Sequence, residues 1–335
     1  MNFIGLLVTL VAAFLLSSVI GVWLIPFLHK LHYGQTILDI GPAWHKSKQG
    51  TPTMGGIMFI IGSILACAAG WCTIAFSAQG LVDASSHGTF YLVGGFLMAL
   101  GFGVIGFLDD YIKVVKKRNL GLKAWQKSAA QLLVAVIYLI AERIFAPNDL
   151  LWIPFAGEFS IGWFYYPLML FIIIGAVNAV NLTDGVDGLA ASVTMVAAMG
   201  FMLIAAIQSF TQMDLMAAAL AGGCLGFLVW NFHPAKVFMG DTGSMFLGGM
   251  VVALAFGLRK PVLLLFIGIV YVVETMSDII QIGSVKLTGK RVFKMAPIHH
   301  HFEMCGWSEM KVCFVFSLVA AIGGLIALAL VFFGV

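Results

Sequence analysis

Aspartates border several apolar segments of this 335-residue sequence. Asp109 and Asp110 follow an apolar run in GFLDDYIKVVKK, and Asp241 lies in GDTGS. Carboxylates at membrane depth are costly, which makes each a candidate functional residue. Helix ending or capping is the alternative, although the helix dipole disfavours anions at a C-terminus. Because successive helical residues diverge by about 100°, we expect Asp109 and Asp110 to point at different atoms and to have distinct roles.

A second polar group occupies the segment NAVNLTDGVDGLA. Asn178 and Asn181 are three residues apart, and so are Asp184 and Asp187, so each pair could share a face if its segment is helical. Helix capping accounts for one or two of these side chains. We therefore expect the others to contribute to a binding site.

Three consecutive histidines, His299, His300 and His301, stand in PIHHHFE. Consecutive side chains point in different directions, and no Cys or His set that could complete a zinc site accompanies them. They could form a solvated, pH-sensitive loop, or they could donate to a phosphate or a developing charge.

Three other patterns indicate structural roles. Glu274, Asp278 and Gln281 follow an i, i+4, i+7 spacing on one face of an apolar segment, which favours hydrogen bonding inside a bundle. The glycines of GFGVIG lie inside an apolar run, where small residues permit close helix packing, so we expect no dinucleotide site there. The five cysteines fit neither a metal-ligand spacing nor a disulfide framework.

The elements that position these residues must be membrane helices. Of the residues, 61% are apolar and 10% are charged, whereas an ordinary soluble domain has about 25% charged residues. The formal net charge is only +3, and we expect no nucleic-acid partner.

The sequence predicts one integral membrane domain over 1–335, of the all-α polytopic class. Ten apolar runs approach the roughly 20 residues that a bilayer requires: Phe3–Leu28, Met54–Phe76, Phe90–Leu108, Trp125–Ile140, Tyr165–Val180, Leu189–Ile207, Leu215–Trp230, Met245–Leu258, Pro261–Ile282 and Val312–Phe333.

The distribution of the 18 Lys and Arg residues predicts the orientation of these spans. Fifteen lie in odd-numbered connections, and only Arg143, Arg259 and Lys260 lie in even-numbered ones. The positive-inside rule then places the odd connections in the cytoplasm and both termini outside. Aromatic and β-branched residues around Gly157 suggest a short outer β-hairpin between the fourth and fifth spans, although an irregular loop is also possible.

This topology gathers the acidic and histidine motifs at one face of the membrane together with many basic residues. Carboxylates, Lys and Arg without a Walker loop favour a divalent cation and a phosphorylated, anionic substrate. Mg²⁺ prefers a few carboxylates combined with substrate phosphates to a complete protein cage.

Five ordered motifs resemble those of the phospho-N-acetylmuramoyl-pentapeptide transferases (translocase I), in the polyprenyl-phosphate N-acetylhexosamine-1-phosphate transferase superfamily. They are HKSKQGTPTMGG, LDDYIKVVKKRNLGL, NAVNLTDGVDGLA, GDTGS and PIHHHFE, and together they span nearly the whole chain. The resemblance implies ten helices, a homodimer, and a multi-pass protein of the bacterial plasma membrane with a cytoplasmic active site. It also implies that the ninth span is bent, with Glu274 and Asp278 near the bend, and leaves a groove for a lipid substrate.

The reaction that the resemblance implies joins UDP-N-acetylmuramoyl-pentapeptide to undecaprenyl phosphate with Mg²⁺, giving lipid I and UMP. Carried over to this chain, Asp109 or Asp110 would deprotonate or orient the lipid phosphate, and Asp241, helped by Asn181, would hold the metal. Asp184 and Asp187 would build the nucleotide pocket, and the three histidines would contact phosphate or sugar. The remaining expected substrate contacts are Lys46, Lys48, Thr51, Lys113, Lys123, Asn178 and Asn231.

The same residues are also compatible with other functions. A related transferase would use UDP-N-acetylglucosamine as donor, and an ion-coupled transporter would use the carboxylates as an ion path. An aspartate could also act as the nucleophile and form a covalent phospho-sugar intermediate.

Overall fold

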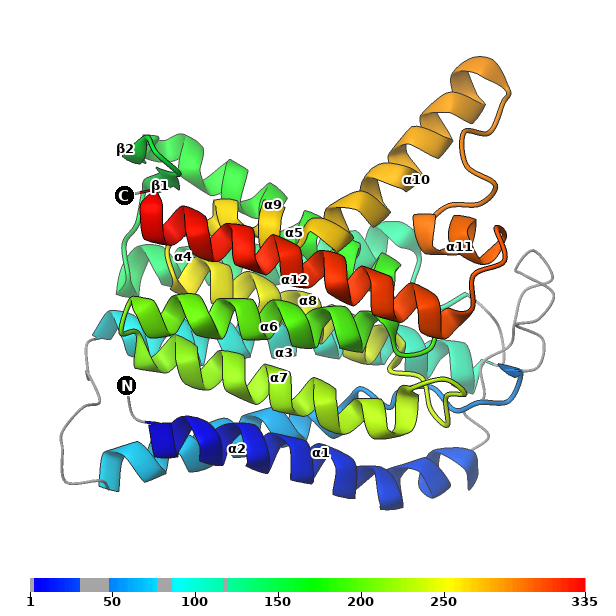
Figure 1. Cartoon of the computed structure of the whole chain (residues 1–335), viewed down its shortest axis with the longest axis horizontal. Coiled ribbons are helices and arrows are strands. Elements are labelled where there is room, and N and C mark those ends of the chain that lie inside the picture. Colours follow the sequence, from blue (N-terminus) through cyan, green and yellow to red (C-terminus); the bar gives the residue numbers. More distant parts are fainter. Residues whose placement is uncertain (1–2, 31–47, 77–85, 117–119, 335) are drawn as a thin grey trace.

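The computed structural model describes residues 3–30, 48–76, 86–116 and 120–334, which form a bundle of long helices running side by side (Figure 1). The long helices are α1 (Phe3–Lys30), α2 (Ile57–Phe76), α3 (Ser86–Val115), α4 (Ala124–Phe145), α5 (Tyr165–Thr183), α6 (Leu189–Ile207), α7 (Thr211–Asn231), α8 (Gly240–Gly257), α10 (Ile269–Thr288) and α12 (Glu309–Phe333). The short elements are β1 (Leu150–Ile153), β2 (Gly157–Ser160), η2 (Gly162–Phe164), η3 (Pro261–Leu263), α9 (Leu264–Ile267) and α11 (Ile298–Glu303).

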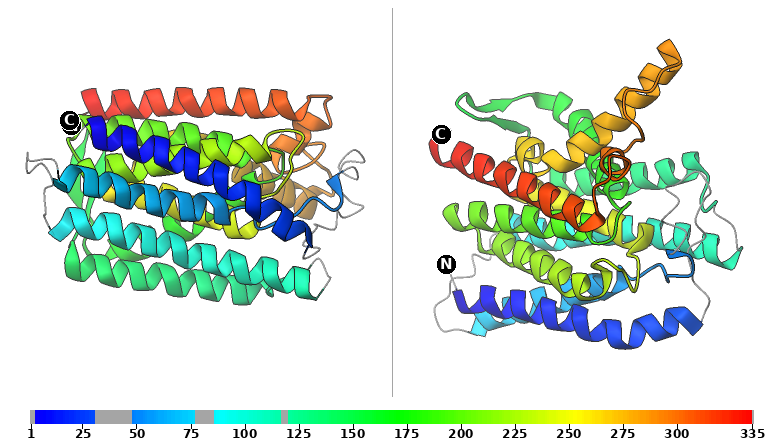
Figure 2. Two further views of the ribbon diagram at one scale, coloured as in Figure 1. Left: turned by 90° about the horizontal axis from the view of Figure 1, so that it is seen from below. Right: turned by 45° about the vertical axis from the view of Figure 1, so that its right-hand side comes forward.

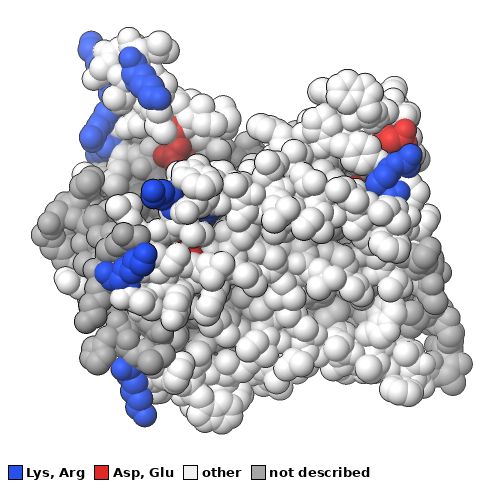
Figure 3. Space-filling view, turned by 180° about the vertical axis from the view of Figure 1, so that it is seen from behind, with Lys and Arg blue, Asp and Glu red and all other residues white. Residues whose placement is uncertain are grey.

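Nine helices of the described part are long and apolar enough to cross a membrane, and the bent pair of α9 and α10 provides a tenth candidate. This agrees with the predicted helical, polytopic class. α1 begins and α12 ends at the same end of the bundle (Figure 1). We call this the far end, and the opposite end, where α3 ends and α4 begins, the basic end. On the face seen in Figure 3, most Lys and Arg side chains gather toward the basic end, and a broad band without charge separates them from a smaller charged group.

Helix α8 lies at the centre of the bundle. Every residue from Thr242 to Gly257 is buried, as expected for a helix that is apolar on all sides. The prediction started this span at Met245, but the helix begins five residues earlier, at Gly240. Asp241 therefore lies in the first turn, where the helix dipole favours an anion.

The third span also differs from its predicted extent, which ended at Leu108. α3 continues to Val115, so Asp109 and Asp110 lie inside the helix and not at its C-terminus. The Lys113 ammonium lies 2.6 Å from Asp109 and 3.8 Å from Asp110, at spacings of i+4 and i+3. Such pairs support helix continuation, which explains why the two acidic residues do not end the helix.

The close approach of α3 to α8 depends on Gly106, one of the glycines of the GFGVIG run. A Cβ atom at this position would overlap the backbone of Asp241. This contact agrees with the packing role that we inferred for the run, and it positions the first turn of α8 against α3.

Gly106→Ala is therefore expected to destabilise the protein by about 1–3 kcal/mol, the usual cost of overpacking. Thermal unfolding in detergent would measure the change. Gly175→Ala on α5 is the matched control, because a Cβ there would have no neighbour within 4 Å. An equal loss of stability in both variants would contradict the packing argument.

The ninth predicted span is bent, as expected, but the bend is elsewhere. α9 and α10 meet at 81° around Gly268, whereas the prediction placed the bend near Glu274 and Asp278. Those two residues lie within the regular part of α10, after the bend. α10 projects out of the bundle in Figures 1 and 2.

At the far end, β1 and β2 pair antiparallel, with Leu150 opposite Ser160 and Ile153 opposite Gly157.

Candidate active site

Four helices bring polar side chains together at the basic end. The C-terminal part of α3 supplies Asp109, Asp110 and Lys113, the first turn of α4 supplies Lys127, the last turn of α5 supplies Asn181, and the first turn of α8 supplies Asp241. We call these six residues the carboxylate cluster. They come from segments separated by up to 132 positions, so only the packing of α3, α4 and α5 around α8 unites them.

Asp241 accepts contacts from three neighbouring helices. Its Oδ2 lies 2.9 Å from the Lys127 ammonium and 3.1 Å from the Lys113 ammonium. Its Oδ1 accepts a 3.0 Å hydrogen bond from the Asn181 amide, which also donates to Ser244 at 2.7 Å. Charge-assisted bonds of this kind are about twice as strong as neutral ones, so they fix both oxygens of this carboxylate.

Asp109 and Asp110 have different partners, yet they face the same centre. Asp109 accepts the Leu122 N–H at 2.7 Å and pairs with Lys113. Oδ2 of Asp110 accepts both the backbone N–H and the hydroxyl of Thr242, at 2.9 and 2.7 Å. The expectation of distinct contacts is therefore supported. The expectation that Asp109 and Asp110 could not point at a common atom was wrong. One carboxylate oxygen from each of Asp109, Asp110 and Asp241 lies within 4.8 Å of the corresponding oxygens of the other two.

The donor set of the cluster fits a hard divalent cation. Three carboxylates supply oxygen ligands only, and two of them are almost completely buried, with Asp109 4% and Asp110 3% exposed. Mg²⁺ is commonly bound by one or two carboxylates together with substrate phosphates. Lys113 and Lys127 lie beside these oxygens and are suited to hold the phosphates.

A second ionic cluster lies where α12 begins. Lys48 donates to Asp187 at 2.7 Å and to Glu309 at 2.6 Å, and His233 lies 3.0 Å from the other oxygen of Asp187. We call Lys48, Asp187, His233 and Glu309 the Lys48 cluster. Their carboxylate and imidazole atoms are close enough to hold a metal, but the Lys48 ammonium already bridges the two acids, so we interpret the cluster as an ion-pair network.

Asp184 and Asp187 lie in the turn between α5 and α6, the segment in which they could have shared a face only if it were helical. α5 ends at Thr183, and Gly188 adopts a left-handed conformation with φ +77° before α6 starts, so this segment is not helical and the two aspartates do not share a helix face. Asp187 joins the Lys48 cluster. Burial raises the pKa of Asp184 to about 8, and the charges of Asp241, Asp110 and Asp187 add to this effect.

Several predicted contact residues have structural partners instead. Asn178 exchanges hydrogen bonds with Gln131 of α4 at 2.9 and 3.2 Å. Asn231 accepts from the Gly188 N–H and donates to the Val237 carbonyl, which holds the α5–α6 turn against α7. Both residues thus brace the site in this structure.

Thr51 and Lys123 occupy the edge of the site. Thr51 lies in a segment whose backbone pairs with residues 238–239, next to α8. Lys123 is exposed at the start of α4, where its N–H donates to Gln126, and Lys127 one turn later reaches Asp241. Lys46 lies outside the described residues.

The three histidines on α11 point to different partners, as expected. His299 is fully buried, and its Nδ1 lies 3.0 Å from Glu274 of α10, while its ring packs against Gly185 of the α5–α6 turn. His300 bonds Glu303 at 2.6 Å, and His301 accepts the Lys294 N–H at 3.1 Å. Glu274 therefore holds His299 against the turn that carries Asp184 and Asp187.

Replacement of Glu274 by Ala is expected to lower turnover about tenfold, because His299 loses the partner that orients it and catalysis depends strongly on position. Glu274→Gln keeps an acceptor for Nδ1–H and should retain most of the turnover. Steady-state kinetics of both variants would measure the difference. Equal losses in Ala and Gln would mean that charge, and not orientation, is what Glu274 supplies.

Sequence reasoning did not identify Lys127, His233, Thr242 and Glu309 as site residues. Glu309 is 122 positions from Asp187 and resembles an ordinary acidic residue in the first turn of a helix. Lys127 stands one helical turn after Lys123, so this spacing was the one available signal that a lysine of α4 could face the site.

Comparison with known proteins agrees with this geometry. Residues 92–259 match the model of glycosyl transferase family 4, and residues 48–60 match signature 1 of phospho-N-acetylmuramoyl-pentapeptide transferases. A protein of that name from Heliobacterium modesticaldum is 47% identical over 95% of this chain and 97% of its own length. Another, from Bacillus mycoides, is 46% identical over 99% of this chain and 98% of its own. This chain therefore belongs to the phospho-N-acetylmuramoyl-pentapeptide transferase family.

Proposed function

We propose that this protein transfers phospho-N-acetylmuramoyl-pentapeptide from its UDP-linked form to undecaprenyl phosphate, which produces lipid I and UMP for peptidoglycan synthesis. The observation that carries the proposal is the carboxylate cluster, in a chain that shares 46–47% identity with named transferases of this family. Three carboxylates and two lysines at one end of a membrane bundle suit a reaction between two phosphorylated substrates.

The reaction exchanges one phosphoanhydride for another. An oxygen of the lipid phosphate attacks the β-phosphorus of the donor, a new P–O bond forms, and the bond to the UMP oxygen breaks. Because similar bonds are made and broken, catalysis depends mainly on positioning and on neutralising charge. Lys113 and Lys127 supply two positive charges within 3.1 Å of Asp241, and they would hold the donor's pyrophosphate.

We assign the orientation of the lipid phosphate to Asp110. Both oxygens of Asp109 are engaged by Leu122 and Lys113. In Asp110 Oδ2 is held by Thr242, and Oδ1 has a more distant neighbour, the Lys113 ammonium at 3.8 Å. Asp110 Oδ1 is therefore the carboxylate oxygen best placed to accept a proton from the acceptor phosphate or to orient it.

Asp241, with an oxygen of Asp109 close beside it, would hold Mg²⁺, and Asn181 would orient Asp241 from outside the ligand set. When bound, the ion would neutralise charge on the donor's phosphates. The Asn181 amide nitrogen donates to Asp241, which supports a role for Asn181 in orienting this carboxylate.

Chelation of divalent cations is expected to abolish UMP release, and Mg²⁺ should restore it. A second readout does not depend on turnover: Mn²⁺ should bind to the wild-type protein, as detected by electron paramagnetic resonance, and bind much more weakly to the Asp241→Asn variant. Unchanged Mn²⁺ binding in that variant would remove Asp241 from the metal site.

The Lys48 cluster would form part of the nucleotide pocket. Asp187 and the α5–α6 turn lie between α11 and the start of α12, and Cys313 donates to the Asp187 carbonyl.

We further propose that the basic end faces the cytoplasm of a bacterial cell and that the protein spans its plasma membrane. The distribution of Lys and Arg supports this orientation. The family likeness also predicts a homodimer, which sedimentation in detergent would measure.

Donor choice tests the proposed function. Purified protein supplied with undecaprenyl phosphate and Mg²⁺ should release UMP from UDP-N-acetylmuramoyl-pentapeptide at a rate far above that from UDP-N-acetylglucosamine. The opposite preference would support the related transferase. Absence of UMP from either donor, in detergent and without an ion gradient, would contradict a transferase.

A further inference from the structure

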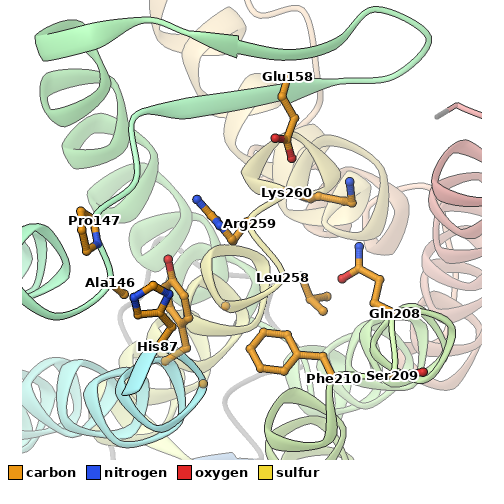
Figure 4. A pocket seen from close by; sticks show the side chains of 13 residues that line it. His87, Ala146, Pro147, Glu158, Gln208, Ser209, Phe210, Leu258, Arg259 and Lys260 are labelled. Atoms are coloured by element: carbon orange, nitrogen blue, oxygen red, sulfur yellow. The ribbon is translucent and has the colours of Figure 1, made fainter. Parts of the chain in front are cut away.

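A polar pocket opens at the far end of the bundle, away from both clusters described above. Its volume is about 400 Å³, and it lies between α3, the segment after α4, β2 and the ends of α6 and α8. Figure 4 shows Arg259, Lys260 and Glu158 around this pocket, with His87 and Gln208 on opposite sides. Phe210 and Leu258 give it an apolar wall.

The close contacts described for the two cations of the pocket are with neutral groups, although the charges of Glu142 and Glu158 act on Arg259 and Lys260 from a greater distance. The Arg259 guanidinium donates to the Asn148 side-chain oxygen at 2.8 Å, and the Lys260 ammonium lies 3.9 Å from the centre of the Trp152 ring. Within the described ranges, no acidic residue lies within 4.0 Å of either cation, although Glu158 lines the same pocket. Burial lowers the pKa of Lys260, and the negative charge of Glu158 partly offsets this effect.

The backbone at Arg259 gives an independent indication. After α8, the Arg259 N–H bonds the Phe256 carbonyl and the Lys260 N–H bonds the Ala255 carbonyl, which is the Schellman pattern. This pattern places Arg259 at φ +56°, a conformation that strongly favours glycine. An arginine at such a position costs about 1 kcal/mol or more, which is consistent with a function for its side chain.

Few basic residues lie in the even-numbered connections between the predicted spans, which include the segments around this pocket. Only three of the 18 Lys and Arg residues lie in the even-numbered connections, and two of these, Arg259 and Lys260, line this same pocket. The third, Arg143, is exposed in the last turn of α4 and is not part of the lining. Exposed aromatic residues near β2, among them Phe155, Trp163 and Phe164, are typical of the membrane–water boundary.

We propose that this pocket binds a phosphate group, with the Arg259 guanidinium as a bidentate donor and the Lys260 ammonium as a second positive charge. A planar guanidinium matches two phosphate oxygens, and an ammonium supplies a compact charge beside them. The apolar wall and the neighbouring aromatic residues suit a phospholipid headgroup of the adjacent leaflet, and free phosphate shares the same chemistry. The proposal is independent of the proposed transferase activity.

Two probes and one matched control test the proposal. The full-length protein is purified with phosphatidylglycerol removed, and binding of phosphatidylglycerol and of inorganic phosphate is followed by native mass spectrometry and by thermal unfolding. Arg259→Gly removes the guanidinium and suits the left-handed backbone, so misfolding is not expected to confuse the result. Lys260→Gln removes the second charge, and Arg143→Gln removes an exposed charge at the same end but outside the pocket.

Each pocket variant is expected to bind the phosphate-containing probe about tenfold more weakly, which is the effect of one lost charge-assisted hydrogen bond, while Arg143→Gln binds it as the wild type does. If this pattern holds for phosphatidylglycerol alone, the source is a lipid headgroup. If it also holds for inorganic phosphate, free phosphate can occupy the pocket. Binding of both probes that is unchanged in Arg259→Gly and Lys260→Gln, binding lost equally in Arg143→Gln, or no binding to the wild type would overturn the proposal.

Discussion

The Asp241→Asn variant is expected to release UMP roughly 10²–10³-fold more slowly than the wild-type protein, an effect of the size seen when one group of a preorganised electrostatic site is removed. Asp241 is the meeting point of the carboxylate cluster, because Lys113, Lys127 and Asn181 all contact it. Asparagine has nearly the same shape but carries no charge, so the two lysines would lose the anion that positions them.

UMP release by purified protein, together with thermal unfolding, would check this prediction. Asp149→Asn is the matched control, because Asp149 is exposed at the far end and pairs only locally with Ser160. That variant should retain wild-type rates. An Asp241→Asn protein that is folded and keeps more than about a tenth of the wild-type rate would exclude the central role of this carboxylate.

The second large effect is expected at Lys48. Its side chain is 13% exposed and bridges Asp187 and Glu309, which are 3% and 8% exposed. Lys48→Met would leave two buried carboxylates facing each other without the ammonium. Breaking a buried ion pair by removing one partner costs about 3–5 kcal/mol, and the KM for the nucleotide donor should also rise.

Unfolding in mixed detergent micelles would measure the loss of free energy. The double variant Lys48→Met/Glu309→Gln should recover part of it, because one of the two unpaired charges is then absent. Lys236→Met is the control, since Lys236 is exposed at the same end and contacts the Trp230 ring and no acidic residue described here. A loss at Lys48 no larger than at Lys236 would show that the bridge contributes little.

The sequence was informative about which residues the fold brings together in the carboxylate cluster. Asp109, Asp110, Asp241 and Asn181 stand at the ends of separate apolar runs, and the Lys and Arg distribution placed those ends on one side of the membrane. Each membrane helix crosses the whole bilayer, so successive connections alternate between its two sides. The order of the spans therefore determines which connections lie on the same side. Hence, the carboxylate cluster could be anticipated from motifs far apart in the chain.

Details that depend on packing could not be predicted. The ends of α3 and α8 were misplaced because hydropathy stops at the first charged residue, whereas Lys113 pairs with Asp109 and lets the helix continue. No proline stands at the bend around Gly268, and the residues on both sides of this glycine are apolar. Glu309 reaches Asp187 only through the tertiary contact between α12 and the α5–α6 turn.

The covalent alternative can be separated from direct attack by the lipid phosphate. Direct attack requires both substrates before any bond to UMP breaks, since the acceptor oxygen supplies the new bond to phosphorus. In the covalent alternative, an aspartate would attack first and would release UMP from the donor alone.

The most direct test is a count of UMP against lipid-linked product, in detergent, with labelled UDP-N-acetylmuramoyl-pentapeptide, Mg²⁺ and purified protein. We expect one UMP for each lipid-linked phospho-muramoyl-pentapeptide and no UMP when undecaprenyl phosphate is omitted. With the Asp241→Asn variant, both products should form roughly 10²–10³-fold more slowly. UMP released without the acceptor, together with label on the protein, would contradict direct attack. Lipid product formed by Asp241→Asn at the wild-type rate would contradict the assignment of the reaction to this cluster.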